Sequence, residues 1–232
     1  MIPLVVIRPE PGRSASVAAA RALGLEAVGA PLFVIEPQAW DAPDRDEFDA
    51  LLVGSANVFR HGGAGLARYS GLPVHVVGAA TAAAARAAGF AVGTVGSGGL
   101  QRVLDALDNR PGPGRLLRLA GAKRIALTPP EGVTMTERTV YASRALPMAT
   151  GLAQRLAAPH VVALHSAEAA RHFAAECDRL GVDRRHIALA VIGPRVASAA
   201  GGGWRATGVA DNPDETALLA KARELCQTCR GD

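Results

Sequence analysis

Short apolar runs alternate with alanine-rich stretches along most of the chain. The runs are rich in Val, Leu and Ile and are mostly continuous rather than alternating with polar residues. Continuous apolar runs of this length are typical of strands that are buried on both faces of a parallel sheet. The predicted strands are Leu4–Ile7, Ala50–Val53, Val74–Val77, Leu116–Leu119, Val161–Leu164 and Leu189–Ile192.

The stretches between these runs are predicted to be helices. Three of them end at Gly24, Gly89 and Gly181, and glycine is the residue that most often closes a helix. Alternation of strand and helix predicts crossover units and therefore an α/β fold with parallel sheets. The predicted helices are Ala15–Leu23, Thr81–Ala88, Gln101–Leu107, Ala167–Cys177, Arg195–Ala200 and Glu215–Cys226.

The same order of elements occurs twice. One strand ends near Ser55 and the next near Gly78, and corresponding strands end near Ser166 and Gly193. The serines are 111 residues apart and the glycines 115 residues apart. This near-constant offset predicts two similar domains of about 100 residues, each a parallel sheet flanked by helices.

Two extended stretches, Pro31–Glu36 and Thr136–Arg144, fit inside neither repeat. We interpret them as a two-stranded linker that joins the domains, with a cleft between the domains. The first domain is then discontinuous, built from residues 1–34 and 146–232, and the second comprises residues 35–145, including the linker strands. Between Gly121 and Gly132 the pattern predicts a short helix that Pro129-Pro130 breaks.

Composition excludes several classes of protein. With 49% hydrophobic and 20% charged residues, the 232-residue chain is not disordered. No apolar run reaches the roughly 18 residues of a membrane helix, and no signal peptide is evident, so we expect a cytoplasmic protein. Three cysteines give no disulfide framework, and we interpret Cys226-x-x-Cys229 as a helix end rather than a zinc or redox site.

The charge pattern favours a small anionic partner over nucleic acid. The net charge is +4, the arginines are dispersed, and only 4% of residues are aromatic. No P-loop or dinucleotide fingerprint is present, and the six histidines show no metal-ligand spacing. We therefore expect no metal.

Four predicted strand-to-helix corners could bind anions. Ligands of parallel sheets bind beyond the carboxyl ends of the strands, and helix starts offer free N–H groups and partial positive charge. Ser55, Thr81 and Ser166 suit helix caps, whereas Gly78 and Gly193 would let backbone approach a ligand. Simple caps and tight turns are the alternative interpretation. The corners are Ser55-Ala56, Gly78-Ala79-Ala80-Thr81, Ser166-Ala167 and Gly193-Pro194-Arg195.

Further candidates lie at other strand ends. Arg8 follows the first strand and could pair with a carboxylate, and Gly121 precedes Lys123 and Arg124, which could do the same. Tyr141 lies in a predicted linker strand, where its phenol could donate a proton to a leaving group, although a packed aromatic side chain is an equal alternative.

These residues, in this order, resemble the uroporphyrinogen-III synthase family over nearly the whole chain. The set of motifs carries the resemblance rather than any single one, and Gly54 stands where relatives commonly have threonine. The matching stretches are Val6-Ile-Arg8-Pro9-Glu10-Pro11, Leu51-Leu-Val-Gly-Ser55-Ala56-Asn57, Val76-Val-Gly78-Ala-Ala-Thr81, Leu117-Arg118-Leu-Ala-Gly121, Thr139-Val-Tyr141, His165-Ser166-Ala167, Ile192-Gly193-Pro194 and Gly203-Trp204.

The resemblance implies an enzyme that uses no cofactor. Its substrate would be hydroxymethylbilane, a linear tetrapyrrole with eight carboxylates, cyclised with loss of water and inversion of ring D to uroporphyrinogen III. Tyr141 would assist the leaving hydroxyl, and Ser55, Thr81 and Ser166 would bind substrate with neighbouring amides. The upstream bilane-forming enzyme is a candidate partner, and we expect a monomer.

Two other functions remain open at this point. A non-catalytic, two-lobed cytoplasmic binding protein for a small polyanion would show the same corners. A nucleotide-dependent α/β enzyme would share the architecture but lacks its phosphate-binding motifs here.

Overall fold

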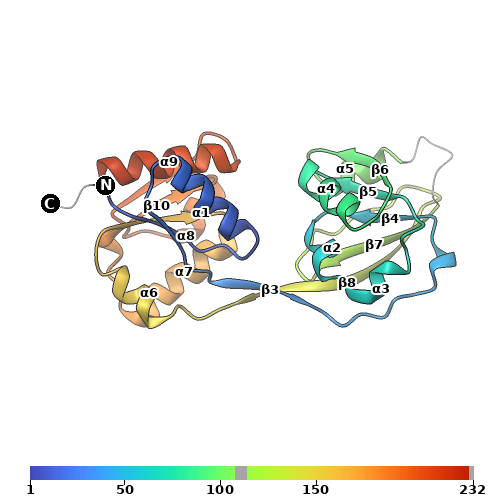
Figure 1. Ribbon diagram of the computed structural model, residues 1–232, viewed down its shortest axis with the longest axis horizontal. Helices are drawn as coiled ribbons and strands as arrows, with labels where there is room; N and C mark the ends of the chain where they lie inside the picture. The colour runs from blue at the N-terminus through green and yellow to red at the C-terminus, as the bar shows by residue number, and fades with distance from the viewer. Residues whose placement is uncertain (108–113, 230–232) are drawn as a thin grey trace. The chain divides into compact units, whose positions relative to one another are not determined.

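The computed structural model describes residues 1–107 and 114–229. The chain divides into two compact units. The first unit comprises Met1–Val34 and Arg144–Asp232, and the second comprises Ile35–Ser143. Each unit contains one sheet with helices packed on it (Figure 1), which confirms the predicted α/β class.

The first unit holds a five-stranded sheet of order β11-β10-β9-β1-β2, and every neighbouring pair is parallel. Because parallel strands share one direction, the segments that follow β1, β9 and β10 lie at the same edge of the sheet. The strands are β1 (Leu4–Val6), β2 (Ala27–Gly29), β9 (His160–Leu164), β10 (Ile187–Val191) and β11 (Ala206–Val209).

Helices cover both faces of this sheet. Leu4 and Val6 pack with α1 and α9, whereas Val5 packs in a second cluster with α6, α7 and α8. Alternate residues of a strand point to opposite faces, so the continuous apolar run of β1 contributes side chains to the hydrophobic core on each face of the sheet. The helices are α1 (Gly12–Ala22), α6 (Thr150–Arg155), α7 (Ala167–Leu180), α8 (Pro194–Ala200), α9 (Glu215–Thr228) and the 3₁₀ turn η2 (Arg184–His186).

The second unit holds a six-stranded sheet of order β3-β8-β7-β4-β5-β6. The pairs from β8 to β6 are parallel. The ends of β7 and β4 therefore meet at one edge, which positions the candidate site described below. The strands are β3 (Phe33–Pro37), β4 (Ala50–Val53), β5 (Val74–Val77), β6 (Val92–Gly96), β7 (Arg115–Gly121) and β8 (Thr134–Ala145).

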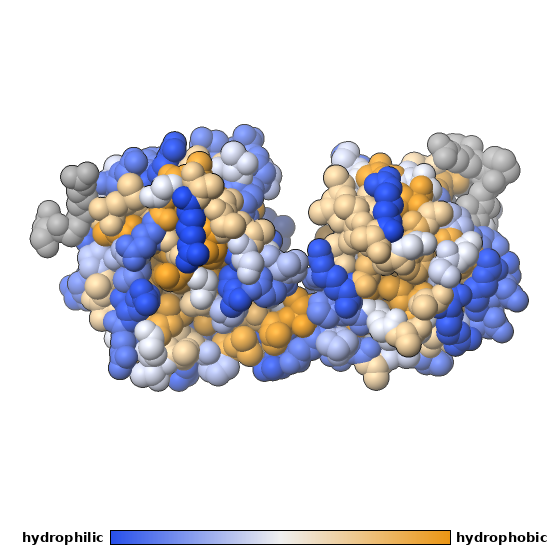
Figure 2. Space-filling view, in the orientation of Figure 1, coloured by the Kyte–Doolittle hydropathy of each residue, from blue (hydrophilic) through white to orange (hydrophobic). Residues whose placement is uncertain are grey.

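Helices also cover both faces of the second sheet. Leu51 and Val53 pack with α2, α3 and α4, whereas Leu52 packs with α5 on the other side. The solvent face of α4 is largely alanine and forms part of the pale orange surface of this unit in Figure 2. The helices are α2 (Asn57–His61), α3 (Gly63–Ala67), α4 (Ala79–Ala87), α5 (Leu100–Asp105) and the 3₁₀ turn η1 (Arg45–Glu47).

Strands β3 and β8 both run across the boundary between the units. They are antiparallel neighbours, because Gln38 N–H donates to the Val140 carbonyl and Leu146 N–H donates to the Leu32 carbonyl. The expectation that Thr136–Arg144 fits inside neither repeat is wrong in part. This stretch belongs to β8, which pairs with β7 of the second sheet from Thr134 to Tyr141. The residues of β8 are mostly polar and half-buried, so the search for continuous apolar runs did not identify it as a strand of the sheet.

The predicted short helix between Gly121 and Gly132 is absent. Residues 122–130 adopt no regular secondary structure. Pro129 and Pro130 lack the N–H groups that a helix needs, and each proline also restricts the residue before it to extended conformations. This irregular segment lies over the candidate site. None of the helices within residues 1–107 and 114–229 has the length and apolar character needed to cross a membrane.

A buried carboxylate ties the chain that leaves β8 to helix α7. Glu176 accepts the N–H of Met148 at 2.5 Å and is also bound by the Arg179 guanidinium at 2.6 Å. The hydrogen bond from Arg179 is the main reason that the pKa of Glu176 falls to about 2; burial opposes it, and the Met148 N–H reinforces it. The carboxylate is therefore stabilised in its charged form in the folded protein.

We predict that Glu176→Gln lowers the free energy of unfolding at pH 7 by about 1–3 kcal/mol, because charge-assisted hydrogen bonds are lost. The carboxyl pKa is lower in the folded than in the unfolded chain. The wild type should therefore keep this stabilisation above about pH 4.5 and lose it as the pH falls toward 2, whereas the variant should not show that loss. Urea unfolding followed by circular dichroism at several pH values measures both effects.

Glu224→Gln provides the matched control. Glu224 lies on α9 with its side chain 58% exposed and pairs only at the surface with Lys221, so its loss should cost less than about 1 kcal/mol. Equal effects of the two substitutions would contradict the structural role of Glu176.

Candidate active site

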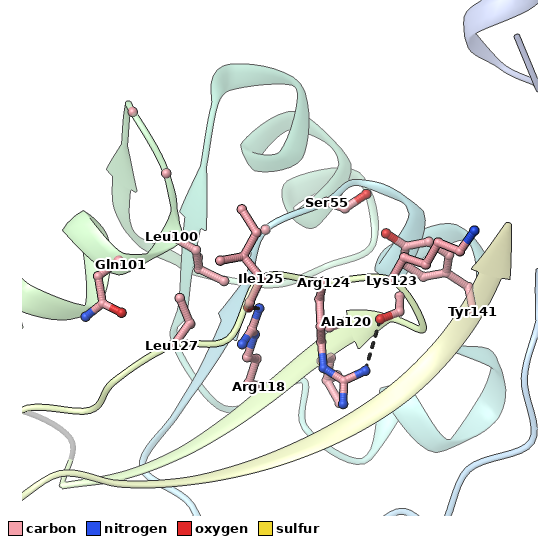
Figure 3. Close-up of a pocket in the computed structure, with 15 residues that line it drawn as sticks. Ser55, Leu100, Gln101, Arg118, Ala120, Lys123, Arg124, Ile125, Leu127 and Tyr141 are labelled. Atoms are coloured by element: carbon pink, nitrogen blue, oxygen red, sulfur yellow. Dashed lines mark hydrogen bonds between the residues drawn. The ribbon is translucent and has the colours of Figure 1, made fainter. Parts of the chain in front are cut away.

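A pocket of about 390 Å³ lies at the carboxyl edge of the second sheet (Figure 3). The ends of β4 and β7, the start of α5, the irregular segment after β7 and one residue of β8 form its walls. The lining residues are Gly54, Ser55, Gly98, Gly99, Leu100, Gln101, Arg118, Leu119, Ala120, Gly121, Lys123, Arg124, Ile125, Leu127 and Tyr141.

The pocket brings together three of the predicted site residues, Ser55, Gly121 and Tyr141. Lys123 and Arg124, which the sequence pointed to more loosely, also line it. The corner after β5 does not contribute to the lining, although β5 neighbours β4 in the sheet. The predicted residues that lie outside this pocket but within the second unit are Ala56, Gly78, Ala79 and Thr81.

The Tyr141 ring can lie where it does because Gly121 has no side chain. A Cβ atom on Gly121 would lie 2.6 Å from the Tyr141 Cζ and 2.9 Å from its hydroxyl, so the ring packs directly over this glycine. The strand register shifts between Ala120 and Gly121, and the Ala122 N–H donates to the Tyr141 carbonyl at 2.9 Å. In Figure 3, Tyr141 and Lys123 lie at the opposite end of the pocket from Gln101.

The two predicted caps of the second unit differ in outcome. The Ser55 hydroxyl accepts the N–H of Asn57, the first residue of α2, at 3.2 Å, although Ala56 occupies the N-cap position itself. Thr81 is not a cap, because α4 begins two residues earlier, at Ala79. Gly78 is the N-cap with φ +80°, a left-handed conformation that favours glycine, and Thr81 is buried in the first turn.

The corners of the first unit lie together at the edge of its own sheet. Ser166 is the N-cap of α7 and accepts the Ala169 N–H at 3.1 Å, which confirms its predicted capping role. Gly193 is the N-cap of α8, but its φ of 177° is an extended conformation that any residue adopts, so its backbone does not require glycine. Ala167 begins α7, and Pro194 and the exposed Arg195 begin α8.

Arg8 does pair with a carboxylate, but the carboxylate belongs to the same unit. Its guanidinium binds Glu215 at 2.9 Å and the Ser16 hydroxyl at 3.3 Å, and His165 lies 3.0 Å from the same Glu215 oxygen. Although partial burial raises the pKa of Glu215, the hydrogen bonds from His165 and Ser16 and the Arg8 charge hold it below its usual range. This cluster fixes Arg8 at the end of β1.

Sequence reasoning missed Arg118 as a site residue. It lies within a predicted apolar strand, and its side chain is 4% exposed. Its guanidinium donates to Glu137 at 2.5 Å and to the Ile125 carbonyl at 2.7 Å. A cation inside an apolar run was the available signal, since buried arginines are rare unless they are paired or functional.

Glu137 also binds Arg124, at 2.9 Å. Partial burial alone would raise the pKa of Glu137, but the hydrogen bonds from Arg124 and Arg118 outweigh it and lower the pKa below its usual range. The carboxylate therefore stays charged and holds both guanidinium groups in place beside the pocket.

The described residues offer little for a metal. Within residues 1–107 and 114–229, no cluster of three or more His, Cys, Asp or Glu side chains could hold a metal ion. Cys226 is buried, and this burial raises the pKa of its thiol to about 11, which leaves it unreactive at neutral pH.

The fold and the pocket define a two-unit α/β protein with a cationic site at a sheet edge. A family model described as uroporphyrinogen-III synthase HemD matches residues 14–220. The chain belongs to the uroporphyrinogen-III synthase family, an enzyme family of tetrapyrrole biosynthesis that acts on hydroxymethylbilane.

Solved structures support the same fold. A uroporphyrinogen-III synthetase from Helicobacter pylori superposes with a TM-score of 0.65 at 14% identity, covering 97% of this chain and 100% of that one. A mutant uroporphyrinogen III synthase from Thermus thermophilus gives a TM-score of 0.51 at 17% identity, covering 98% and 100%. No curated protein sequence matches the chain.

We predict that Gly121→Ala displaces the Tyr141 ring, because the added methyl group would occupy the space that the ring fills. The chain has two tyrosines, so selective labelling resolves both rings by NMR. The Tyr141 signals should shift while those of Tyr69 stay in place.

Gly114→Ala is the matched control, since its new Cβ would lie 3.6 Å from the Gly132 carbonyl, an ordinary contact. Unshifted Tyr141 signals in Gly121→Ala would show that the glycine does not position the ring.

Proposed function

We propose that the protein catalyses the reaction of its family, the cyclisation of hydroxymethylbilane with inversion of ring D and loss of water, to give uroporphyrinogen III without a cofactor. The single observation that carries this proposal is the pocket with three cationic side chains, apolar walls and a tyrosine. Carboxylates of the substrate would meet the cations, and a pyrrole ring would meet the apolar walls.

The cations suit this substrate better than a neutral one. Arg118, Lys123 and Arg124 line the pocket, and among its lining residues within 1–107 and 114–229 there is no aspartate or glutamate. Buried carboxylates are costly unless each finds a charged or N–H partner. The serine and glycine corners add backbone N–H donors, which bind anions without placing a further charge in the site.

Tyr141 has the chemistry required at the leaving group. Its phenol would donate a proton to the departing hydroxyl as the carbon–oxygen bond breaks, which releases water and leaves an azafulvene cation on the bilane. The pyrrole rings supply the electrons for the later steps. The protein then folds the chain and orients ring D, so positioning supplies much of the acceleration.

The remaining predicted residues are proposed substrate contacts at the sheet edges of their own units. Those of the second unit are Ala56, Gly78, Ala79 and Thr81; those of the first are Arg8, Ser166, Ala167, Gly193, Pro194 and Arg195. We further propose that the two compact units are the folding domains and that the protein is a cytoplasmic monomer.

The direct test supplies fresh hydroxymethylbilane to the purified protein, oxidises the product and separates the isomers by chromatography. We predict isomer III in excess. Isomer I, which forms spontaneously, should appear alone only without protein or with heat-denatured protein. Isomer I alone in the presence of native protein would reject the proposed activity and leave a non-catalytic binding protein.

For Tyr141→Phe we predict a fall in kcat of about 10–100-fold, because the proton donor is lost while the ring still packs over Gly121. Activity should remain above the spontaneous rate.

Tyr69→Phe is the matched control. The Tyr69 hydroxyl donates to the Pro43 carbonyl, and Tyr69 lies outside the pocket lining, so kcat should not change. Equal kcat values for the wild type and Tyr141→Phe would remove the acid role from Tyr141.

A further inference from the structure

Arg118 is a buried cation with an incomplete set of partners. Its Nη1 donates to Glu137 and its Nη2 donates to the Ile125 carbonyl, at 2.5 and 2.7 Å. Its Nε is also buried and has no hydrogen-bond partner within the part of the chain that the structure describes. A buried donor without a partner loses its hydration without compensation, and native structures contain few of them.

The Nε/Nη2 side of the Arg118 guanidinium has fewer hydrogen-bond acceptors than it could bind. Nε–H and one Nη–H group of arginine form a parallel fork that matches the two oxygens of a carboxylate. Glu137 occupies a single nitrogen, Nη1. On the Nε/Nη2 side of the guanidinium, the Ile125 carbonyl is a single neutral acceptor, which binds Nη2. A carboxylate at that place could accept two charge-assisted hydrogen bonds, one from Nε and one from Nη2. The site is therefore better matched to an anion than to its present acceptor.

That acceptor belongs to a residue with an exposed side chain in an irregular segment. Ile125 lies in the irregular stretch 122–130, and its side chain is among the most exposed large apolar groups of the protein, at 85%. The Ile125 side chain therefore adds nothing to the core, whereas Leu127 of the same stretch packs against the core cluster that contains Leu104.

The backbone of the stretch is held at Ile125 by Arg118 and, at its start, by Arg124, which donates to the Gly121 carbonyl at 3.2 Å. Farther along, the Gln101 side chain bonds both the N–H and the carbonyl of Thr128 at 2.9 Å, so a carboxylate need displace only the part around Ile125.

The pocket around Arg118 has the composition of a site for an acidic ring compound. Leu100, Leu119 and Leu127 supply apolar walls, while Lys123 and Arg124 add positive charge (Figure 3). Its volume of about 390 Å³ is at the lower end of the range of about 300–1,000 Å³ for small-molecule sites, which suits one substituted ring rather than a four-ring chain.

We propose that Arg118 binds one carboxylate of a substrate pyrrole ring through its Nε–H and Nη2–H groups, and that this carboxylate replaces the Ile125 carbonyl. The inference rests on the proposed function for the identity of the ring. Glu137 acts as a positioning residue, because it fixes Nη1 of Arg118 and Nε of Arg124 and so directs the Nε/Nη2 fork of Arg118. Substrate recognition then includes a buried side chain and a movable backbone segment, in addition to main-chain donors at helix starts.

The test observes the arginine Nε–H signals of the full-length protein by NMR. The probe is a monopyrrole that carries one acetate and one propionate group, and its dimethyl ester is the uncharged control. We expect the acid to shift the Arg118 signal saturably and the ester to leave it unchanged. Arg138 provides an internal reference, because its Nε–H donates to the Asp41 carbonyl and it lies outside the pocket lining.

A matched pair of variants extends the test. Arg118→Lys keeps the positive charge but removes the fork, so it should weaken binding of the acid probe at least about tenfold and raise KM for hydroxymethylbilane more than it lowers kcat. Arg138→Lys should change neither quantity. Circular dichroism checks that both variants fold. If Arg118→Lys does not fold, the NMR titration of the wild type alone decides whether Arg118 binds the carboxylate.

The outcomes separate this inference from the proposed function. An unmoved Arg118 signal, or an equal response to acid and ester, would overturn the inference even if the protein produces isomer III. A saturable acid-specific shift without any isomer III would support the carboxylate site and overturn the enzymatic proposal.

Discussion

The parallel register of the second sheet is the constraint on which the candidate site depends. Because β4, β7 and β8 run in one direction, Ser55 after β4, Gly121 at the end of β7 and its pairing partner Tyr141 on β8 meet at a single edge. The same register sets Arg118 opposite Glu137 on adjacent strands. A shift of one residue would turn Arg118 to the other face of the sheet and separate its guanidinium from the pocket.

The site combines two ways of stabilising negative charge. Helix starts and turns, such as the corner at Ser55, offer N–H groups that carry no full charge. The arginines beside the pocket carry full charges, and Glu137 neutralises part of that charge while it fixes their geometry. We propose that these features together favour acidic ligands while Arg118 and Arg124 keep Glu137 as their partner.

The sequence predicted the buried strands and several helix ends because their apolar runs and terminal glycines act locally. It also predicted the Ser166 cap, which depends on residues within one turn. Thr81 was misassigned because the left-handed Gly78 starts α4 earlier than the polar residue indicated. A cation within an apolar run marked Arg118 as unusual, but its partners Glu137 and Ile125 could not be predicted, since they come from other segments that only the folded sheet brings close.

In the proposed function, the pocket at the edge of the second sheet binds one ring of the tetrapyrrole. Backbone amide NMR of the full chain with added uroporphyrinogen III tests it most directly. We expect the largest chemical-shift changes in the second unit to fall on residues around the pocket, such as Ser55, Gly121 and Lys123. Saturable binding that leaves all of these signals unchanged would contradict it.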